Sequence, residues 1–163
     1  MYSVEEFDKG KTKVLKYILY KRRTENEVRT KFQNVIDEEM LEDIIEYLKQ
    51  AKYIDDKDYI DRLINNFKIL KNMSQLELRY KLIAKGLSKD LIEDYMYENK
   101  EELTDYEINS ASKIIIKKQR DLEKQEIITF LLKKGYKKEN INKAFDQIEK
   151  GEEWKKYYFL PIL

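Results

Sequence analysis

The chain has 163 residues, of which 40% are charged and 42% hydrophobic, with only four glycines and one proline. This composition is typical of amphipathic helices joined by short turns, and it argues against long disordered linkers. Because the chain contains neither cysteine nor histidine, a disulfide framework, a thiolate metal site and the usual neutral-pH general base are excluded. The 33 basic residues nearly cancel the 32 acidic ones, so the net charge of +1 gives no overall attraction to nucleic acid.

The first residues, Met1 to Lys11, mix acids and bases and lack the apolar segment of a signal peptide. No run in the sequence approaches the ~20 apolar residues that a membrane-spanning helix needs. We therefore expect a soluble, cytoplasmic protein with no membrane partner.

A segment of about fifty residues occurs three times in the sequence. The stretch SQLELRYKLIAKGLSKDLIEDY begins at Ser74 and returns from Glu123 as EKQEIITFLLKKGYKKENINKA. An earlier copy, TENEVRTKFQNVIDEEMLEDII, begins at Thr24. Self-similarity at a fixed period is the signature of a repeat architecture.

Two of the three copies open with the same helix-start motif. Thr24 to Glu27 and Ser74 to Glu77 have the pattern S/T-x-x-E of a capping box, in which the hydroxyl and the carboxylate satisfy backbone N–H groups at a helix start. The third copy has Glu123 where the other two have a hydroxyl residue. The motifs predict helices that begin at equivalent places.

A glycine marks the end of this helix in the second and third copies. Gly86 and Gly135 each follow a Lys-bearing turn and precede an apolar residue, Leu87 or Tyr136. This pattern is typical of a helix ended by a residue with positive φ and a hydrophobic contact behind it. The first copy lacks the glycine and has Asn34-Val35-Ile36 there.

Amphipathic runs flank each capped helix on both sides and complete a three-helix unit. The sequence thus predicts an all-α fold, an elongated tandem array of three three-helix, helix-turn-helix-like repeats with nine helices. The repeats are expected at 11–54, 55–101 and 102–150, followed by a C-terminal tail at 151–163. We expect the apolar tail residues to pack back on the third repeat rather than form a site; they are Trp154, Tyr157, Tyr158, Phe159 and Leu160.

Several of these segments together resemble the RecX regulatory family. The resemblance covers roughly Lys11 to Ile148 and includes YKRRTENEVRTKF, KLIAKGLSKDLIED and the junction YLKQAKYIDDKDYIDRLI. Its most specific part is Tyr53-Ile54-Asp55-Asp56 followed by Tyr59, where the first repeat ends and the second begins.

The resemblance implies a protein that binds the RecA filament on single-stranded DNA and modulates RecA recombinase, ATPase and coprotease activities, with inhibition as the expected direction. It also implies RecA as the protein partner, contact with the single-stranded DNA inside the filament, weak direct DNA binding and a monomeric state. Such a protein acts in recombination, DNA repair and the SOS response without being an enzyme.

Charges form alternating bands along the sequence. Nine basic residues lie between Lys9 and Lys31 and nine more between Lys113 and Lys138, whereas Asp90 to Glu107 holds eight acids and one lysine. The functional interpretation is a patterned surface that meets a protein–DNA filament, and the alternative is an ordinary solvated helix surface with i,i+4 ion pairs. The residues expected to contact RecA or DNA are Lys21, Arg22, Arg23, Arg29, Arg79, Lys81, Lys117, Lys118 and Arg120.

Two further groups of residues have a structural and a functional interpretation. Asp55, Asp56 and Asp58 are expected to cap a helix, because no calcium-loop glycine or distal glutamate completes a metal site. Most of the 13 tyrosines lie at helical spacing beside Ile and Leu and are expected to pack, although Tyr17, Tyr20, Tyr80 and Tyr106 are candidates for base stacking. No phosphate-binding glycine loop occurs, and no catalytic, metal or cofactor site is predicted.

Two other functions remain open from the sequence: a helix-turn-helix-type DNA-binding regulator and a helical scaffold for an unrelated protein. The first needs a basic recognition helix, but the third helices, DEEMLEDIIEYLKQ and SKDLIEDYMY, are acidic and would be repelled by phosphates.

Overall fold

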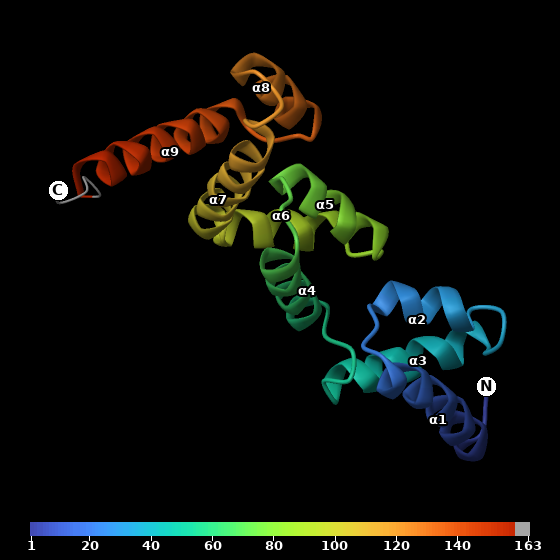
Figure 1. Ribbon diagram of the computed structural model, residues 1–163. Helices are drawn as coiled ribbons and strands as arrows, with labels where there is room; N and C mark the ends of the chain where they lie inside the picture. The colour runs from blue at the N-terminus through green and yellow to red at the C-terminus, as the bar shows by residue number, and fades with distance from the viewer. Residues whose placement is uncertain (159–163) are drawn as a thin grey trace. The chain divides into compact units, whose positions relative to one another are not determined.

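The structure is a computed structural model that describes residues 1–158, with side chains described through residue 151. The described residues form nine helices and no strands, which confirms the predicted all-α fold class (Figure 1). The helices are α1 (Val4–Tyr20), α2 (Glu25–Phe32), α3 (Glu38–Gln50), α4 (Asp56–Leu70), α5 (Gln75–Ala84), α6 (Lys89–Glu98), α7 (Lys100–Lys118), α8 (Lys124–Lys133) and α9 (Lys138–Tyr158).

The chain divides into two compact units, and the division does not follow the predicted repeats. One unit consists of Met1–Ile64 and Lys81–Tyr95, and the other of Asn65–Tyr80 and Met96–Leu163. Helices α4, α5 and α6 each contribute residues to both units. The division into three repeats remains a prediction.

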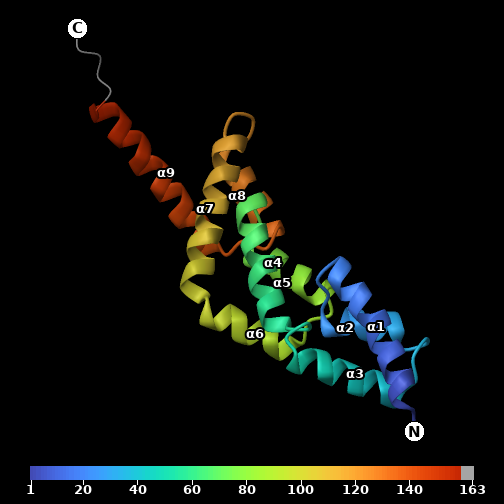
Figure 2. The same cartoon turned by 90° about the horizontal axis from the view of Figure 1, so that it is seen from below.

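In the first unit, α1, α2 and α3 pack against one another, and they lie together in both views (Figures 1 and 2). Their inner faces form an apolar core, because the buried residues recur at helical spacing. This core consists of Val14, Ile18, Val28, Phe32, Ile36, Leu41, Ile44, Ile45, Leu48 and Ile54.

In the second unit, α7 packs against α8 and α9, and α8 also contacts α9. Their core consists of Ile108, Ala111, Ile115, Ile127, Leu131, Tyr136, Ile141, Ala144 and Phe145.

Among the described residues, no helix combines the length and the apolar content needed to cross a membrane.

The predicted helix starts are confirmed, and one more was missed. The Thr24 and Ser74 hydroxyls accept hydrogen bonds from the Glu27 and Glu77 amides at 3.1 Å each, and the two glutamates bond back to the cap amides at 2.9 Å. Ser3 and Glu6 form a further capping box, so α1 begins at Val4, well before the expected start of the first repeat at residue 11. The motif Ser-Val-Glu-Glu is visible in the sequence and could have indicated this start.

Each of the two cap hydroxyls also holds a later turn of the chain. Thr24 Oγ1 donates to the Lys85 carbonyl at 2.8 Å, and Ser74 Oγ donates to the Lys134 carbonyl at 2.7 Å. Both hydroxyl residues are 0% exposed. A hydroxyl can accept and donate at once, so a single buried atom caps one helix and fixes the end of another.

Neighbouring side chains repeat the same pattern at both places. Glu27 pairs with the Lys85 ammonium at 3.6 Å, and Glu77 pairs with that of Lys134 at 3.3 Å. These contacts connect α2 to the end of α5 in the first unit and α5 to the end of α8 in the second. Residues that correspond in the predicted repeats thus make corresponding bonds.

The turn glycines have positive φ, as predicted, and they also allow close approach. Gly86 has φ +71° and Gly135 has φ +84°. A Cβ at Gly86 would clash with the side-chain amide of Asn26, and one at Gly135 would lie 2.6 Å from Leu76 Cδ2. Glycine is therefore required both by the left-handed backbone and by the side chain that rests on it.

The tail does not form a separate segment at residue 151, because α9 continues to Tyr158. The expected packing of Trp154, Tyr157 and Tyr158 lies outside the described side chains. Phe159 and Leu160 lie outside the described residues altogether.

We predict that Leu82→Ala lowers the free energy of unfolding by roughly 2–5 kcal/mol, because a fully buried side chain leaves a cavity. Ile83→Ala is the matched control, since Ile83 is 53% exposed and its truncation leaves no enclosed void. Urea unfolding of both variants measures the difference. Equal losses of stability in the two variants would contradict the assignment of Leu82 to the buried face of α5 and of Ile83 to its exposed face.

We predict that Gly86→Ala destabilises the protein by at least about 1–2 kcal/mol, because alanine is strained at positive φ and its Cβ meets Asn26. Adding Asn26→Ala should recover only part of the steric loss, because the Cβ of residue 26 would still lie 2.8 Å from the new Cβ, and it should leave the backbone part. Gly151→Ala is the control: it lies in α9 with nothing within 4 Å of its Cβ, and it should gain roughly 0.5–1 kcal/mol. Thermal unfolding monitored by circular dichroism would refute this account if both glycine variants shifted in the same direction.

Candidate functional site

The cations at the end of α1 differ in how free they are to meet a partner. Lys21 is exposed and makes no ion pair with any described residue. Arg22 is exposed and pairs with Asp58 at the start of α4. Both residues can reach a partner, although Arg22 must exchange an intramolecular carboxylate for it.

Two of the predicted contact residues are committed to the fold. The Arg23 guanidinium lies 4.4 Å from the ring centroid of Tyr17, and its Nε is buried without a hydrogen-bond partner. Arg29 is half-buried and binds the carboxylates of Glu25 and Glu42. The guanidinium of Arg29 thus connects α2 with α3.

The remaining predicted residues are also mixed. Lys117 and Arg120 are exposed at the end of α7, whereas the Lys118 ammonium lies 4.0 Å from the ring centroid of Phe130. On α5, Arg79 is half-buried and Lys81 is exposed. Of the nine predicted contact residues, those that are exposed and form no ion pair within the described part of the chain are Lys21, Lys81, Lys117 and Arg120.

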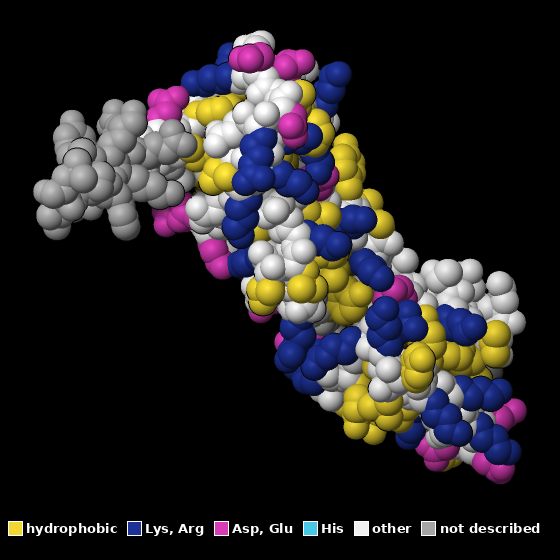
Figure 3. Space-filling view, in the orientation of Figure 1, with side chains coloured by type: hydrophobic (Ala, Val, Ile, Leu, Met, Phe, Trp, Pro, Cys, Tyr) yellow, Lys and Arg dark blue, Asp and Glu magenta, His cyan; other side chains and the backbone are white. Residues whose placement is uncertain are grey.

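The exposed surface is not purely basic. On the face shown in Figure 3, blue lysine and arginine side chains lie beside yellow hydrophobic ones over α1–α3, with a few magenta acids among them. A surface of this kind offers apolar contact as well as charge, so it suits a protein partner in addition to phosphates.

The four tyrosines singled out for base stacking separate into two pairs. Tyr17 packs edge-on against Phe32 at 5.6 Å, and the Tyr106 hydroxyl donates to the Lys71 carbonyl at 2.7 Å. Tyr20 and Tyr80 are 88% and 60% exposed. Only the second pair is open to a ligand.

The three aspartates at the α3–α4 junction have separate roles in the fold. Asp55 Oδ1 accepts from the Asp58 amide at 3.1 Å and caps α4, as predicted. Asp56 instead accepts from the Glu25 amide at 3.0 Å and so caps α2. Asp58 binds Arg62 and Arg22. The sequence indicated helix capping but not which helix Asp56 would cap.

The second unit contains a counterpart of the Asp56 contact. The carboxylate of Glu107, which is 0% exposed, accepts from the Gln75 amide at 2.8 Å. In both units, therefore, a carboxylate from one helix satisfies the first free amide of another, in addition to that helix's own capping box.

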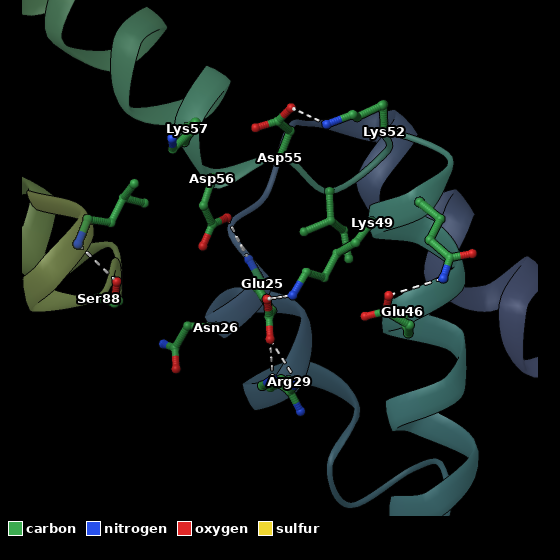
Figure 4. A pocket seen from close by; sticks show the side chains of 14 residues that line it. Glu25, Asn26, Arg29, Glu46, Lys49, Lys52, Asp55, Asp56, Lys57 and Ser88 are labelled. Atoms are coloured by element: carbon green, nitrogen blue, oxygen red, sulfur yellow. Dashed lines mark hydrogen bonds and ion pairs between the residues drawn. The ribbon is translucent and has the colours of Figure 1, made fainter. Parts of the chain in front are cut away.

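A pocket of about 720 Å³ lies beside Asp56, between α2, α3, the start of α4 and the α5–α6 turn (Figure 4). Its charged side chains pair mainly with one another. Lys49 lies 3.0 Å from Glu25, which also binds Arg29, and Lys52 lies 3.6 Å from Asp55. The charged side chains of the pocket thus largely neutralise one another, and little net charge remains to attract a ligand.

Burial raises the pKa of Asp56, and the nearby Glu25 carboxylate acts in the same direction, against the hydrogen bond from the Glu25 amide. No group of three or more acidic side chains in the described residues is placed to hold a metal ion.

Comparison with known proteins supports the resemblance found in the sequence. No protein-family model matches the chain. A curated protein named "Regulatory protein RecX" from Staphylococcus carnosus is 33% identical over 89% of this chain and 56% of its own length. One from Streptococcus equi subsp. equi is 31% identical over 82% of this chain and 53% of its own length. The chain spans little more than half of these relatives.

Solved structures share the fold. The crystal structure of RecX from Lactobacillus salivarius superposes with a TM-score of 0.77, at 21% identity, over 90% of this chain and 99% of that one. A second structure, of "regulatory protein RecX", gives a TM-score of 0.73 over 86% of this chain and 73% of its own, also at 21% identity.

We predict that Asp56→Asn is at least as stable as the wild type at pH 7, because asparagine keeps an acceptor for the Glu25 amide and removes a buried charge beside another carboxylate. The raised pKa means that the wild type gains stability relative to this variant as the pH falls toward the ordinary value of 3.8, so the difference should shrink there. Urea unfolding at pH 7 and at about pH 4 measures it.

Asp56→Ala is the control for the hydrogen bond. It removes the acceptor and should be less stable than Asp56→Asn at both pH values. A variant Asp56→Asn that is less stable than the wild type at pH 7 would show that the charge of Asp56 stabilises the junction.

Proposed function

Because the chain is homologous to the RecX regulatory proteins over most of its length and shares their fold, we propose that it binds the RecA filament on single-stranded DNA and inhibits RecA. In this role it acts as a monomeric cytoplasmic regulator of recombination, DNA repair and the SOS response, and it catalyses no reaction. The division into three repeats, at 11–54, 55–101 and 102–150, belongs to this proposal.

The observation that carries the proposal is homology along the chain, and exposed cations in each of the two units support it. Lys21, Lys81, Lys117 and Arg120 are available for phosphates or for acidic patches on RecA. Arg22, Arg79 and Lys118 stand next to them in the sequence and can add to the contact. Arg23 and Arg29 are instead engaged within the first unit, by Tyr17, Glu25 and Glu42.

A helix-turn-helix-type DNA-binding regulator is less well supported. Such a protein would place a third helix in the major groove, where phosphates repel acids. In α3, five acids accompany one lysine, and in α6 four acids accompany one lysine. A scaffold for an unrelated protein would bind neither RecA nor DNA, so a measurement of binding to RecA filaments separates it from the leading proposal.

We predict that the combined charge reversals Lys21→Glu, Lys117→Glu and Arg120→Glu weaken filament binding and flatten its dependence on salt. Each lost phosphate contact should reduce the slope of log K against log salt by roughly 0.7 for single-stranded DNA. Fluorescence anisotropy of labelled RecA filaments, titrated at several salt concentrations, measures both effects.

The control carries the same change in net charge at other exposed lysines in first helical turns: Lys57→Glu, Lys89→Glu and Lys100→Glu. Unaltered binding by the first variant, or equal weakening by both, would place the contact elsewhere. No association of the wild type with the filament at low salt would remove the proposed function.

A further inference from the structure

Two helices end in pairs of highly exposed apolar residues. Leu19 and Tyr20, the last residues of α1, are 69% and 88% exposed. Ile69 and Leu70, the last residues of α4, are 80% and 72% exposed. We call these the α1 pair and the α4 pair.

The two pairs correspond to each other in the sequence. Each lies 50 residues from the other and ends four residues before a cap hydroxyl, Thr24 or Ser74. Each is also followed at once by an exposed lysine, Lys21 or Lys71, that forms no ion pair within the described residues. An apolar pair followed by a free ammonium is thus presented twice.

The fold itself does not require these side chains. The buried residues of α1 are Gly10, Val14 and Ile18, and those of α4 are Ile60 and Ile64. Polar residues would serve equally well at exposed helix ends, and exposed apolar groups held together in this way mark an interaction surface.

The chemistry of the pairs favours a protein partner over nucleic acid. Three of the four side chains are aliphatic and have no ring to stack on a base, although stacking on aromatic rings is the usual apolar contact with single strands. Aliphatic pairs beside a cation instead complement an apolar pocket with carboxylates at its rim.

We propose that the α1 pair and the α4 pair are two equivalent contacts to a protein polymer, each inserting into an apolar pocket that every subunit repeats, with Lys21 and Lys71 facing acidic residues at the rim. This rests on the proposed function and deepens it, because it assigns the protein part of the filament to the pairs. A partner that repeats one surface can occupy both contacts of one chain, which raises affinity through effective concentration.

The test compares the wild type with three variants: Leu19→Ser with Tyr20→Ser, Ile69→Ser with Leu70→Ser, and all four substitutions together. Binding is measured to RecA filaments assembled on single-stranded DNA and, separately, to the same DNA without RecA. Each two-residue variant should bind filaments at least about tenfold more weakly, and the four-residue variant should lose more than either. Binding to naked DNA should stay unchanged.

The matched control is Val35→Ser with Tyr97→Ser, which removes two apolar side chains that are 61% and 81% exposed outside the pairs. Circular dichroism checks the fold, and alanine replaces serine at the same positions if a variant is misfolded, since alanine favours helix. Filament binding by the four-residue variant at the wild-type level would overturn the proposal.

The other outcomes have distinct meanings. An equal loss of binding to filaments and to naked DNA would assign the pairs to nucleic acid and overturn the proposal. A self-association of the wild type that the four-residue variant loses, with filament binding retained, would assign them to a second copy of the chain. If the wild type itself does not bind filaments, the proposed function fails and this inference fails with it.

Discussion

The architecture depends on a buried hydroxyl that accepts one hydrogen bond and donates another. Thr24 and Ser74 each start a helix by accepting from an amide three residues on, and each fixes a distant turn by donating to a lysine carbonyl. Alanine could do neither, and a carboxylate could only accept. A small core of three short helices has limited stability, so contacts between successive helix groups matter more here than in a larger domain.

This double role explains why the repeated segments differ. In the third copy, Glu123 stands where the other two have a hydroxyl residue. The Glu126 carboxylate still accepts from the Glu123 amide at 2.9 Å, so the helix start is kept although no hydroxyl is present to donate to a later turn. The first copy has Asn34-Val35 where the others have glycine, and α2 ends there without positive φ. The glycine is needed where Asn26 or Leu76 rests on the turn. The hydroxyl therefore contacts the following copy, and the glycine contacts the preceding one.

Features that depend on local sequence were predicted, and those that depend on packing between distant segments were not. The capping boxes at Thr24 and Ser74 and the positive φ of Gly86 and Gly135 were read from short motifs with a direct physical cause. The partner of Asp56 and the ring contacts of Arg23 and Lys118 depend on residues elsewhere in the chain or on the direction that a long side chain takes from its helix. Basic residues do cluster in the sequence, but clustering does not reveal which lysine side chains are exposed to solvent and which lie over an aromatic ring.

The spacing of the hydroxyl contacts bears on how such a chain can change length during evolution. Donor and acceptor lie 61 residues apart in one unit and 60 in the other, and their copies repeat every 49 or 50 residues. A duplication or deletion of the whole second copy, which carries both the hydroxyl of Ser74 and the glycine turn at Gly86, keeps every donor opposite an acceptor. An insertion of a few residues inside a helix would rotate the buried face away and break the register. Gain or loss of whole modules is therefore the change in length that this junction tolerates best.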